Sequence, residues 1–280
     1  MSRVAIVTDS ASDLTPEQAA SAGITVVPLI LTFGDREFRP GRDINAEEFW
    51  RELTAPGAPF PKTAAASPGA FKDAFEAEFS AGADELVFVG VGSKLSATLG
   101  SAKVAREMLP DRPIHLVDSE SACMGEGLLA LLAAEKVKAG ASASEVVRAL
   151  EELRNRIKLF VVLETLEYLK RGGRISPARA AIGSVLSVKP IITVEDGVVE
   201  TVDRPRTRGR ARERLLELIT ERKPTRVVIL DCQSPDIDAF ARDVATATNI
   251  PLDQLPINLV GASVGPHVGP GAYGAVVLTS

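Results

Sequence analysis

The chain has 280 residues, of which 45% are hydrophobic and 25% are charged, the composition of an ordinary globular protein long enough for two domains. Its net charge of −5 and its pI of about 5.3 argue against a general nucleic-acid-binding protein, which would be basic. No apolar run approaches the roughly 18 residues that a membrane-spanning helix needs, and the N-terminus lacks a signal-peptide core, so we expect a cytoplasmic protein without stable membrane insertion.

Short β-branched runs alternate with helix-length amphipathic segments in the first half of the chain, a pattern typical of a parallel α/β sheet. The predicted strands cover residues 4–8, 24–32, 86–91 and 114–117. Helices are predicted to begin after residues that cap helix N-termini, namely Thr15, Asn45 and Ser67. Two further helices are predicted over residues 119–139 and 142–156.

A second set of strands follows in the other half of the chain. These strands are predicted at residues 159–163, 191–194, 198–202, 227–230 and 274–279. We place a domain boundary near residues 155–160, although no linker rich in Pro, Gly or Ser marks it. The predicted fold class is therefore α/β, with an N-terminal parallel-sheet domain of residues 1–157 packed tightly on a C-terminal α/β domain of residues 158–280.

Charge is unevenly distributed along the chain. Residues 170–214 hold 11 Lys and Arg against 5 Asp and Glu, whereas the remainder holds 21 against 32. Such a basic stretch suits an anionic ligand or an acidic partner surface. A solvated basic helix around residues 204–214 would give the same pattern.

Residues 163–176, Leu-Glu-Thr-Leu-Glu-Tyr-Leu-Lys-Arg-Gly-Gly-Arg-Ile-Ser, form the most informative stretch. An apolar, helix-like run ends in cations and the pair Gly172-Gly173, and Ser176-Pro177 would open the next helix. Because glycine adopts backbone angles that side chains forbid, the cations are expected on one tight turn that could hold a phosphate or carboxylate. These cations are Lys170, Arg171 and Arg174. A helix C-terminus ended by Gly, with cations on its dipole, explains the same pattern.

Polar side chains also gather where predicted strands end, which is where open α/β sheets bind ligands. The first strand ends in Thr8-Asp9-Ser10. Asp9 could be a metal ligand, a base, or an acceptor that orders the loop by binding backbone N–H groups. Without a second carboxylate at metal spacing, we favour the ordering role.

Two further loops bring hydroxyl groups to predicted helix starts, which are natural anion sites. One loop carries Thr63 ahead of the predicted cap Ser67, and the other carries Ser93, Ser96 and Thr98. A single Ser or Thr in such a place is more often a cap than a ligand contact. Two such loops together favour an anion-binding site.

The remaining inventory argues against a catalytic centre of a familiar kind. His115 lies inside a predicted strand and is expected to be structural, whereas His267 lies in a loop made rigid by Gly and Pro and is a candidate site residue. Cys123 and Cys232 stand alone, without zinc or redox spacing. No nucleophile elbow, P-loop or dinucleotide fingerprint is present. We therefore expect a protein that holds an acid, with no catalytic residue, metal or cofactor.

Six short motifs occur together along the chain. They are Thr8-Asp9-Ser10, Lys62-Thr63 with Ser67-Pro68, Leu95-Ser96-Ala97-Thr98, residues 163–176, Lys189-Pro190-Ile191 and residues 267–271. In this order and at these spacings, the whole chain resembles the DegV family of fatty-acid-binding proteins. The resemblance implies two α/β domains with the ligand site between them and a long buried pocket for an acyl chain.

The resemblance also implies a function. The protein would bind a long-chain fatty acid and present its carboxylate to a fatty acid kinase, acting as a carrier and not as an enzyme alone. The acyl phosphate formed in this way would feed phospholipid synthesis, with an acyltransferase as a further partner.

Residue roles follow from the same resemblance. Thr63 and Ser96 would bind the carboxylate, and His267 would join their hydrogen-bond network. Ser93 precedes Ser96 in the same loop and could make the contact instead. The supporting or partner-facing residues would be Asp9, Ser10, Arg171, Gly172, Gly173 and Arg174.

Two departures from the family pattern stand beside these residues. Ser96-Ala97-Thr98 replaces the usual Ser-Gly-Thr, and residues 63–67 read Thr-Ala-Ala-Ala-Ser where the family usually has Thr-Ser-Gln-Pro-Ser. These changes alter how the backbone approaches the ligand and remove polar groups beside the head group. They leave the preferred chain length and saturation open while keeping the binding mode.

Physical chemistry is consistent with this expectation. A buried carboxylate is costly unless it is hydrogen-bonded several times, and two hydroxyls, helix-start N–H groups and His267 could supply those bonds. Residues 178–188 read as a small-residue helix, either a buried core helix or a wall that leaves room for an alkyl tail. Two rivals remain, a hydrolase or phosphotransferase that uses Asp9 and His267 as an acid–base pair, and a binding module for a phosphorylated ligand.

Overall fold

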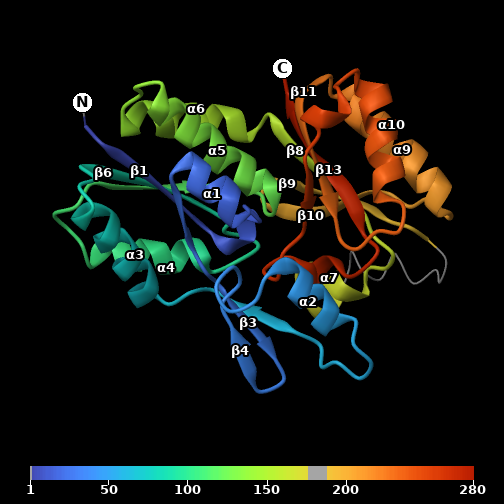
Figure 1. Cartoon of the computed structure of the whole chain (residues 1–280), viewed down its shortest axis with the longest axis horizontal. Coiled ribbons are helices and arrows are strands. Elements are labelled where there is room, and N and C mark those ends of the chain that lie inside the picture. Colours follow the sequence, from blue (N-terminus) through green and yellow to red (C-terminus); the bar gives the residue numbers. More distant parts are fainter. Residues whose placement is uncertain (1, 176–187) are drawn as a thin grey trace.

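The computed structural model describes residues 2–175 and 188–280, and the predicted helix over residues 178–188, with its Ser176-Pro177 start, falls almost wholly outside them. The described strands form a four-stranded, a six-stranded and a three-stranded sheet. The two larger sheets lie side by side, and the chain termini lie on the same side of the molecule, at the top of Figure 1. The mixed α/β fold class is confirmed.

The four-stranded sheet is parallel throughout, as predicted. In spatial order its strands are β2 (Ile24–Val27), β1 (Val4–Asp9), β6 (Glu85–Gly90) and β7 (Ile114–Asp118). Both faces are covered, because side chains alternate along β1: Ala5 and Val7 pack with one buried cluster, and Val4 and Ile6 with another. The first cluster includes side chains from α3 (Pro68–Ser80) and α4 (Thr98–Glu107).

The helix starts follow the predicted capping chemistry. Thr15 caps α1 (Pro16–Ala22) and Asn45 caps α2 (Ala46–Leu53), each with the reciprocal bonds of a capping box. Ser67 Oγ accepts a hydrogen bond from Ala70 N at 3.2 Å at the start of α3. The three predicted N-caps are therefore confirmed.

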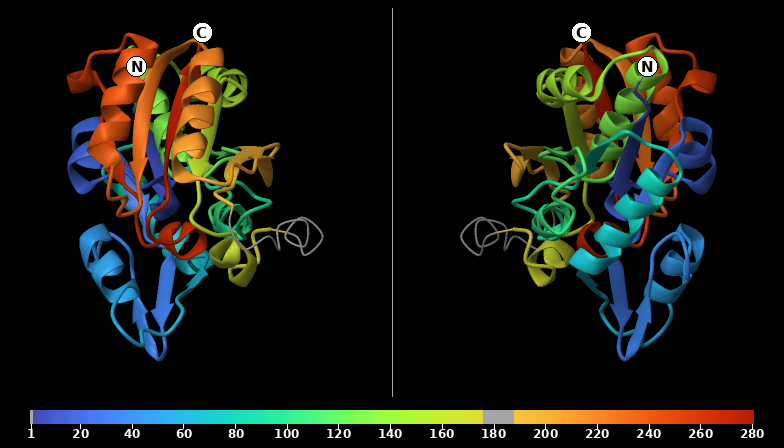
Figure 2. Two further views of the ribbon diagram at one scale, coloured as in Figure 1. Left: turned by 90° about the vertical axis from the view of Figure 1, so that its right-hand side faces the viewer. Right: turned by 90° about the vertical axis from the view of Figure 1, so that its left-hand side faces the viewer.

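The predicted strand over residues 24–32 is wrong in one respect, because it breaks at Pro28, which has no N–H to give to a ladder. The chain after it forms a separate antiparallel sheet, which projects away from the two large sheets (Figure 2). Its strands are β3 (Ile30–Phe33), β4 (Arg36–Phe38) and β5 (Lys62–Ala64).

The six-stranded sheet is mostly antiparallel, with one parallel pair between β11 and β12. In spatial order its strands are β10 (Val198–Asp203), β9 (Ile191–Glu195), β8 (Ile157–Val162), β13 (Tyr273–Thr279), β11 (Pro224–Asp231) and β12 (Ile257–Leu259). Two helices, α9 (Arg208–Glu221) and α10 (Ile237–Thr248), cover one face. The proposed boundary at residues 157/158 falls at the start of β8.

The other face of this sheet shares one buried cluster with the N-terminal sheet. Between the two sheets lies α5 (Met124–Lys138), whose side chains are buried on most sides, while α6 (Ala143–Arg154) packs against it. The predicted helix from residue 119 begins only at Met124, because Glu120 and Cys123 have φ values of 50° and 56°, which an α-helix cannot accommodate. The predicted helix over residues 142–156 is confirmed as α6.

Short helices complete the description. They are the 3₁₀ turns η1 (Ser10–Ser12) and η2 (Leu252–Gln254), α7 (Glu167–Arg171) and α11 (Gly265–Val268). Among the helices that the structure describes, none has the length and apolarity needed to cross a bilayer.

A buried acid, Glu126 of α5, lies beside β1. Thr8 Oγ1 lies 2.8 Å from Val89 O and 2.9 Å from Glu126 Oε1. A hydroxyl has one hydrogen, and Thr8 shares it between Val89 O and the carboxyl oxygen of Glu126, so it stabilises an ionised Glu126 only weakly. Burial, followed by the charge of Asp9, raises the pKa of Glu126 well above its usual range. Glu126 therefore keeps its proton to a higher pH than an exposed glutamate does.

We expect the variant Glu126→Gln to gain stability over the wild type as pH rises from 5 to 8. The folded wild type keeps a proton that the unfolded chain loses above its ordinary pKa of 4.5. Its free energy of unfolding therefore falls with pH, by at most about 1.4 kcal/mol per pH unit, whereas Gln does not titrate. Urea denaturation at several pH values measures the difference.

A matched control is Glu145→Gln, because Ser142 holds the pKa of the exposed Glu145 below its usual value. Any pH-dependent difference in that variant should run in the opposite direction. If the difference between Glu126→Gln and the wild type stayed constant with pH, Glu126 would ionise equally in both states, contrary to our argument.

Candidate functional site

Two adjoining cavities lie where the halves of the chain meet. The first, which we call the apolar cavity, leaves about 80 Å³ open to the centre of a water molecule. Its walls are mainly aliphatic and include Leu95, Leu159, Val161, Ile192, Val199 and Leu230. A cavity of this kind has room for more than one water molecule but offers few hydrogen-bond partners, so it favours an apolar occupant.

The second cavity, which we call the polar pocket, is smaller, at about 50 Å³ on the same measure. Its hydrogen-bonding side chains are Thr63, Ser96, Arg174, Ser263 and His267. Four residues line both cavities, namely Leu95, Arg174, Val264 and His267. Polar groups therefore stand at one end of an otherwise apolar space.

Thr63 and His267 form the first hydrogen bond of the polar pocket. Thr63 lies in β5 and His267 in α11, and Thr63 Oγ1 is 2.9 Å from His267 Nε2. Burial, helped by the charge of Arg174, lowers the pKa of His267 to about 4, so the imidazole is neutral at pH 7. Its buried Nδ1 atom has no hydrogen-bond partner among the described residues. We assign the proton to Nε2, because a proton on Nδ1 would leave a buried N–H without an acceptor; Nε2 then donates to Thr63 and leaves the threonine hydroxyl free to donate to a ligand.

Gly172 is required because the ring of His267 packs on it. A Cβ atom at Gly172 would lie 2.2 Å from His267 Nδ1. Its φ of −74° is ordinary for any residue, so close packing and not backbone freedom requires this glycine. The expectation that both glycines need special backbone angles holds only for Gly173, with φ of 69°.

The structure separates the two candidate serines. Ser96 lines the polar pocket, where its Oγ is 2.8 Å from Thr98 Oγ1 and accepts Thr98 N at 3.3 Å. Ser93 is exposed, donates its backbone N–H to Asp118, and is not among the residues that line either cavity. Ser96 is the one that lies near Thr63 and His267.

The two arginines of the Arg-Gly-Gly-Arg turn point to different places. Arg174 donates to Leu95 O at 3.0 Å and to Gly172 O at 2.6 Å, and it lines both cavities. Arg171 is exposed, with its guanidinium 3.9 Å from the centre of the Phe60 ring. The expected single cluster of cations is therefore divided between the pocket and the surface.

Asp9 is fully buried and orders the loop after β1. Its Oδ1 accepts Ala11 N at 2.9 Å and its Oδ2 accepts Val91 N at 3.0 Å. Burial raises its pKa to about 6 despite these bonds. Asp9 is not among the residues that line the polar pocket, so the structure does not bring it to His267 as an acid–base partner.

Sequence reasoning missed Ser263, which is buried in the wall of the polar pocket. Ser263 Oγ is 2.8 Å from Ser10 Oγ, and Ser10 Oγ accepts Leu29 N at 2.9 Å. The only signal was a hydroxyl four residues before His267. A loop serine of this kind cannot be distinguished from a solvent-exposed one without the fold.

Several cations of the basic stretch are paired with carboxylates, which weakens the case for a separate phosphate site. Arg208 bonds to Glu164 and Asp236, and Arg212 lies 2.6 Å from Asp243. His115, predicted to be structural, lies in β7 with its Nε2 3.3 Å from Glu85.

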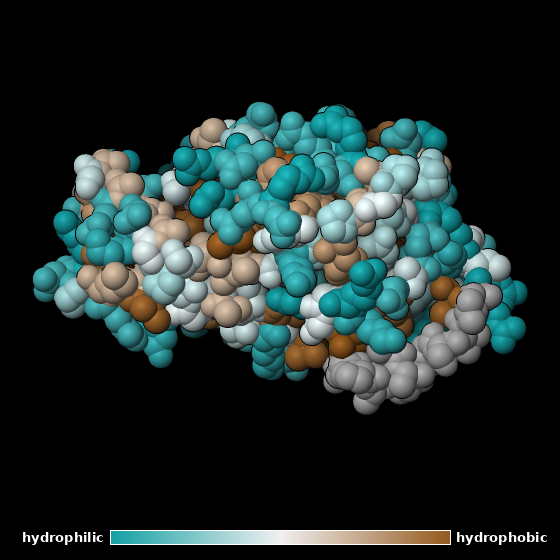
Figure 3. Space-filling model, turned by 90° about the horizontal axis from the view of Figure 1, so that it is seen from below, coloured by the Kyte–Doolittle hydropathy of each residue, from teal (hydrophilic) through white to brown (hydrophobic). Residues whose placement is uncertain are grey.

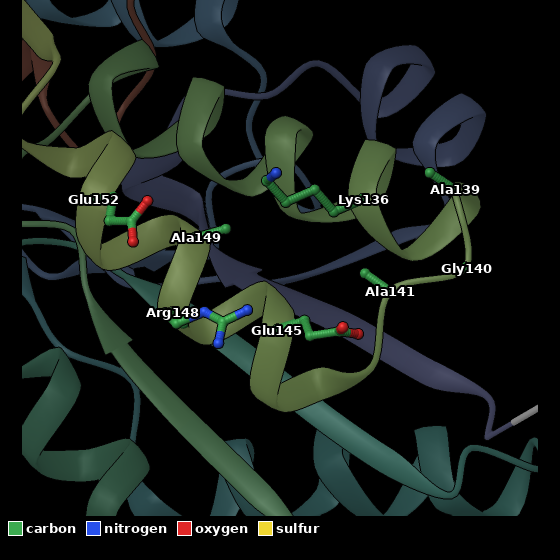
Figure 4. A pocket seen from close by; sticks show the side chains of 8 residues that line it. All are labelled: Lys136, Ala139, Gly140, Ala141, Glu145, Arg148, Ala149 and Glu152. Atoms are coloured by element: carbon green, nitrogen blue, oxygen red, sulfur yellow. The ribbon is translucent and has the colours of Figure 1, made fainter.

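The rest of the described surface offers weaker candidates. A depression between α5 and α6 is lined by charged side chains of both signs, including Lys136, Glu145, Arg148 and Glu152 (Figure 4). The face seen in Figure 3 mixes hydrophilic and hydrophobic side chains. Among the described residues, no group of three or more His, Cys, Asp and Glu could hold a metal ion.

Comparison with known proteins shows the family to which the chain belongs. A model of an uncharacterised protein family, the DegV family, matches residues 3–280. A DegV domain-containing protein of Streptomyces coelicolor is 35% identical, with 99% of each chain covered. Protein DegV of Bacillus subtilis is 30% identical, with 97% of each chain covered.

Solved structures agree with this assignment. The fold matches a fatty-acid-binding DegV family protein from Thermus thermophilus with a TM-score of 0.90 and 33% identity, covering 99% of this chain and 100% of the other. It matches a stearic-acid-binding protein from Eubacterium ventriosum with a TM-score of 0.89 and 27% identity, covering 100% and 98%. The resemblance seen in the six motifs is confirmed, and the chain belongs to the DegV family.

Proposed function

We propose that this protein binds a long-chain fatty acid, with the acyl chain in the apolar cavity and the carboxylate in the polar pocket. The observation that carries the proposal is that these two spaces share a wall containing Arg174 and His267. An amphipathic ligand with one acidic end fits this arrangement. Binding of fatty acids by the Thermus and Eubacterium relatives supports it.

The polar pocket meets the main energetic requirement of such a ligand. A carboxylate moved out of water must be hydrogen-bonded several times. Thr63 and Ser96 offer hydroxyls, and Arg174 offers the N–H groups that Leu95 and Gly172 do not use. The neutral His267 supports Thr63 without adding charge.

The acyl chain supplies most of the binding energy. Each buried methylene contributes about 0.8 kcal/mol, so a chain of about sixteen carbons offers on the order of 10 kcal/mol before ordering costs. This gain is comparable to the one that a lipid bilayer offers the same chain, so a fatty acid can pass between a membrane and the cavity.

We further propose that the protein is a cytoplasmic carrier that presents the carboxylate to a fatty acid kinase, and that the acyl phosphate passes on to an acyltransferase of phospholipid synthesis. Arg171 lies three residues before Arg174, which lines the pocket, but its own side chain is exposed and lies over the ring of Phe60. It is therefore suited to a partner surface. The two-domain division at residues 157/158, with the ligand between the domains, belongs to the same proposal. A hydrolase that pairs Asp9 with His267 has less support, because backbone N–H groups occupy both oxygens of Asp9.

The direct test is organic extraction of the purified protein followed by mass spectrometry. We expect a long-chain fatty acid in about equimolar amount, because an apolar cavity of this kind is filled during expression. Finding no fatty acid, and no uptake of added palmitate, would exclude the carrier function.

The variant Ser96→Ala should weaken palmitate binding by about 10-fold or more, because a hydrogen bond to a charged group is worth about 1.5–3 kcal/mol. Isothermal titration or displacement of a fluorescent fatty acid measures the dissociation constant. The matched control is Ser93→Ala, an exposed serine in the same loop, which should bind as the wild type does. The reverse ranking would assign the contact to Ser93.

The two arginines should have separable effects. Arg171→Ala should keep its affinity for palmitate but lose phosphorylation by an added fatty acid kinase, whereas Arg174→Ala should lose affinity by about 10-fold or more, since it removes a cation from the pocket. Arg148→Ala, on the far helix α6, is the control and should change neither. Full palmitate affinity in Arg174→Ala would remove that residue from the binding site.

A further inference from the structure

Ser263 has the position of a ligand contact, although neither the family resemblance nor the roles proposed above include it. It lines the polar pocket with Thr63 and Ser96, and only 6% of it is exposed. Its hydrogen-bond partner is Ser10, in the loop after β1, with the two Oγ atoms 2.8 Å apart. The pocket therefore contains a third hydroxyl, held from the other half of the chain.

The number of hydrogens on the two hydroxyls favours one donor in the hydrogen bond between Ser10 and Ser263. Ser10 Oγ already accepts the backbone N–H of Leu29 at 2.9 Å. If Ser10 then donates its one hydrogen to Ser263, both of its roles are filled, and the hydrogen of Ser263 remains free to point into the pocket. In the opposite direction Ser10 would accept twice, and its own hydrogen would have no acceptor among the hydrogen bonds of the described residues.

An anion in the pocket selects the first direction. The bonds would then run in one sense, from Leu29 N–H to Ser10, from Ser10 to Ser263, and from Ser263 to the ligand oxygen. Hydrogen bonds aligned in this way strengthen one another, because each polarises the next. In this chain of hydrogen bonds, the backbone N–H dipole of Leu29 strengthens the bond to the ligand through the two serine hydroxyls.

The segment that carries Ser263 is held firmly. Asp13 Oδ1 accepts Gly261 N at 2.9 Å, and Trp50 Nε1 donates to Val260 O at 2.8 Å. Both partners come from the N-terminal half and are buried. The donor is therefore positioned before a ligand arrives, which reduces the ordering cost of binding.

We propose that Ser263 is a third hydroxyl donor to the carboxylate of the bound fatty acid, positioned by Ser10, and that it makes the pocket select an ionised acid over a neutral ester. The proposal rests on the fatty-acid-binding function above. A carboxylate presents two oxygens with about four acceptor sites, which matches Thr63, Ser96, Ser263 and Arg174. A methyl ester accepts fewer bonds and would leave buried donors unpaired, which sites built for hydrogen bonding reject strongly.

The test compares palmitate with methyl palmitate as competitors of a bound fluorescent fatty acid. Ser263→Ala should weaken palmitate binding by about 10-fold and leave methyl palmitate unchanged, so that the preference for the acid falls by the same factor. Ser10→Ala should give a smaller loss for palmitate. In the double variant the Ser10 substitution should add no further loss of affinity.

A matched control is Ser12→Ala. Ser12 lies in the same 3₁₀ turn as Ser10 and is buried, but its hydroxyl has no partner in the described part of the chain and it is not among the residues that line the polar pocket. Its affinity for palmitate should equal that of the wild type. Thermal unfolding distinguishes a loss of stability from a loss of the ligand contact. If Ser10→Ala acted only by destabilising the fold, it would lower the melting temperature by the same amount in the wild type and in Ser263→Ala.

The outcomes separate the proposals. If the wild type fails to bind palmitate at all, the fatty-acid-binding function is wrong, and the role of Ser263 with it. If the wild type binds palmitate and Ser263→Ala keeps both its affinity and its preference for the acid, only the inference about Ser263 is overturned. Independent, additive losses in the double variant would overturn the positioning role of Ser10.

Discussion

Both large sheets of this protein pack against helix α5, and this shared packing is the constraint on which the site depends. One buried cluster includes side chains from β1 and β6, from α5, and from β8, β11 and β13. Because protein interiors are close-packed, the two sheets cannot shift relative to each other without opening voids. The segments that carry Ser96, Ser263 and His267 are therefore held near one another, and Thr63 of β5 reaches the same pocket.

Burial also decides the charge state of the site. His267 is neutral at pH 7 because its environment penalises the imidazolium, and Arg174 reinforces that penalty. The same effect raises the pKa of Glu126, beside β1. The pocket thus combines neutral hydroxyl donors with one arginine, a set that can satisfy a carboxylate without placing a second cation beside the aliphatic cavity. Such a set suits reversible binding better than bond cleavage.

Local chemistry made much of the fold predictable. Parallel strands follow from β-branched runs separated by helix-length segments, and Thr15, Asn45 and Ser67 cap the helices expected of them. Two errors have backbone causes that periodicity does not reveal. Pro28 interrupts a continuous apolar run, and the positive φ angles at Glu120 and Cys123 delay the start of α5. The mostly antiparallel order of the second sheet depends on long-range pairing, which local patterns do not encode.

The candidate site, like the fold, was only partly predictable from the sequence. By itself, the sequence determined the family and marked the hydroxyl-bearing segments, His267 and the Arg-Gly-Gly-Arg turn as candidates, because these depend on residue type and spacing along the chain. Only the tertiary structure decided that Ser96 and not Ser93 faces the pocket, that Arg174 enters it while Arg171 stays outside, and that Ser10 supports Ser263. Those distinctions depend on contacts between segments up to 253 residues apart in the sequence. The contacts form only when the two halves of the chain pack together.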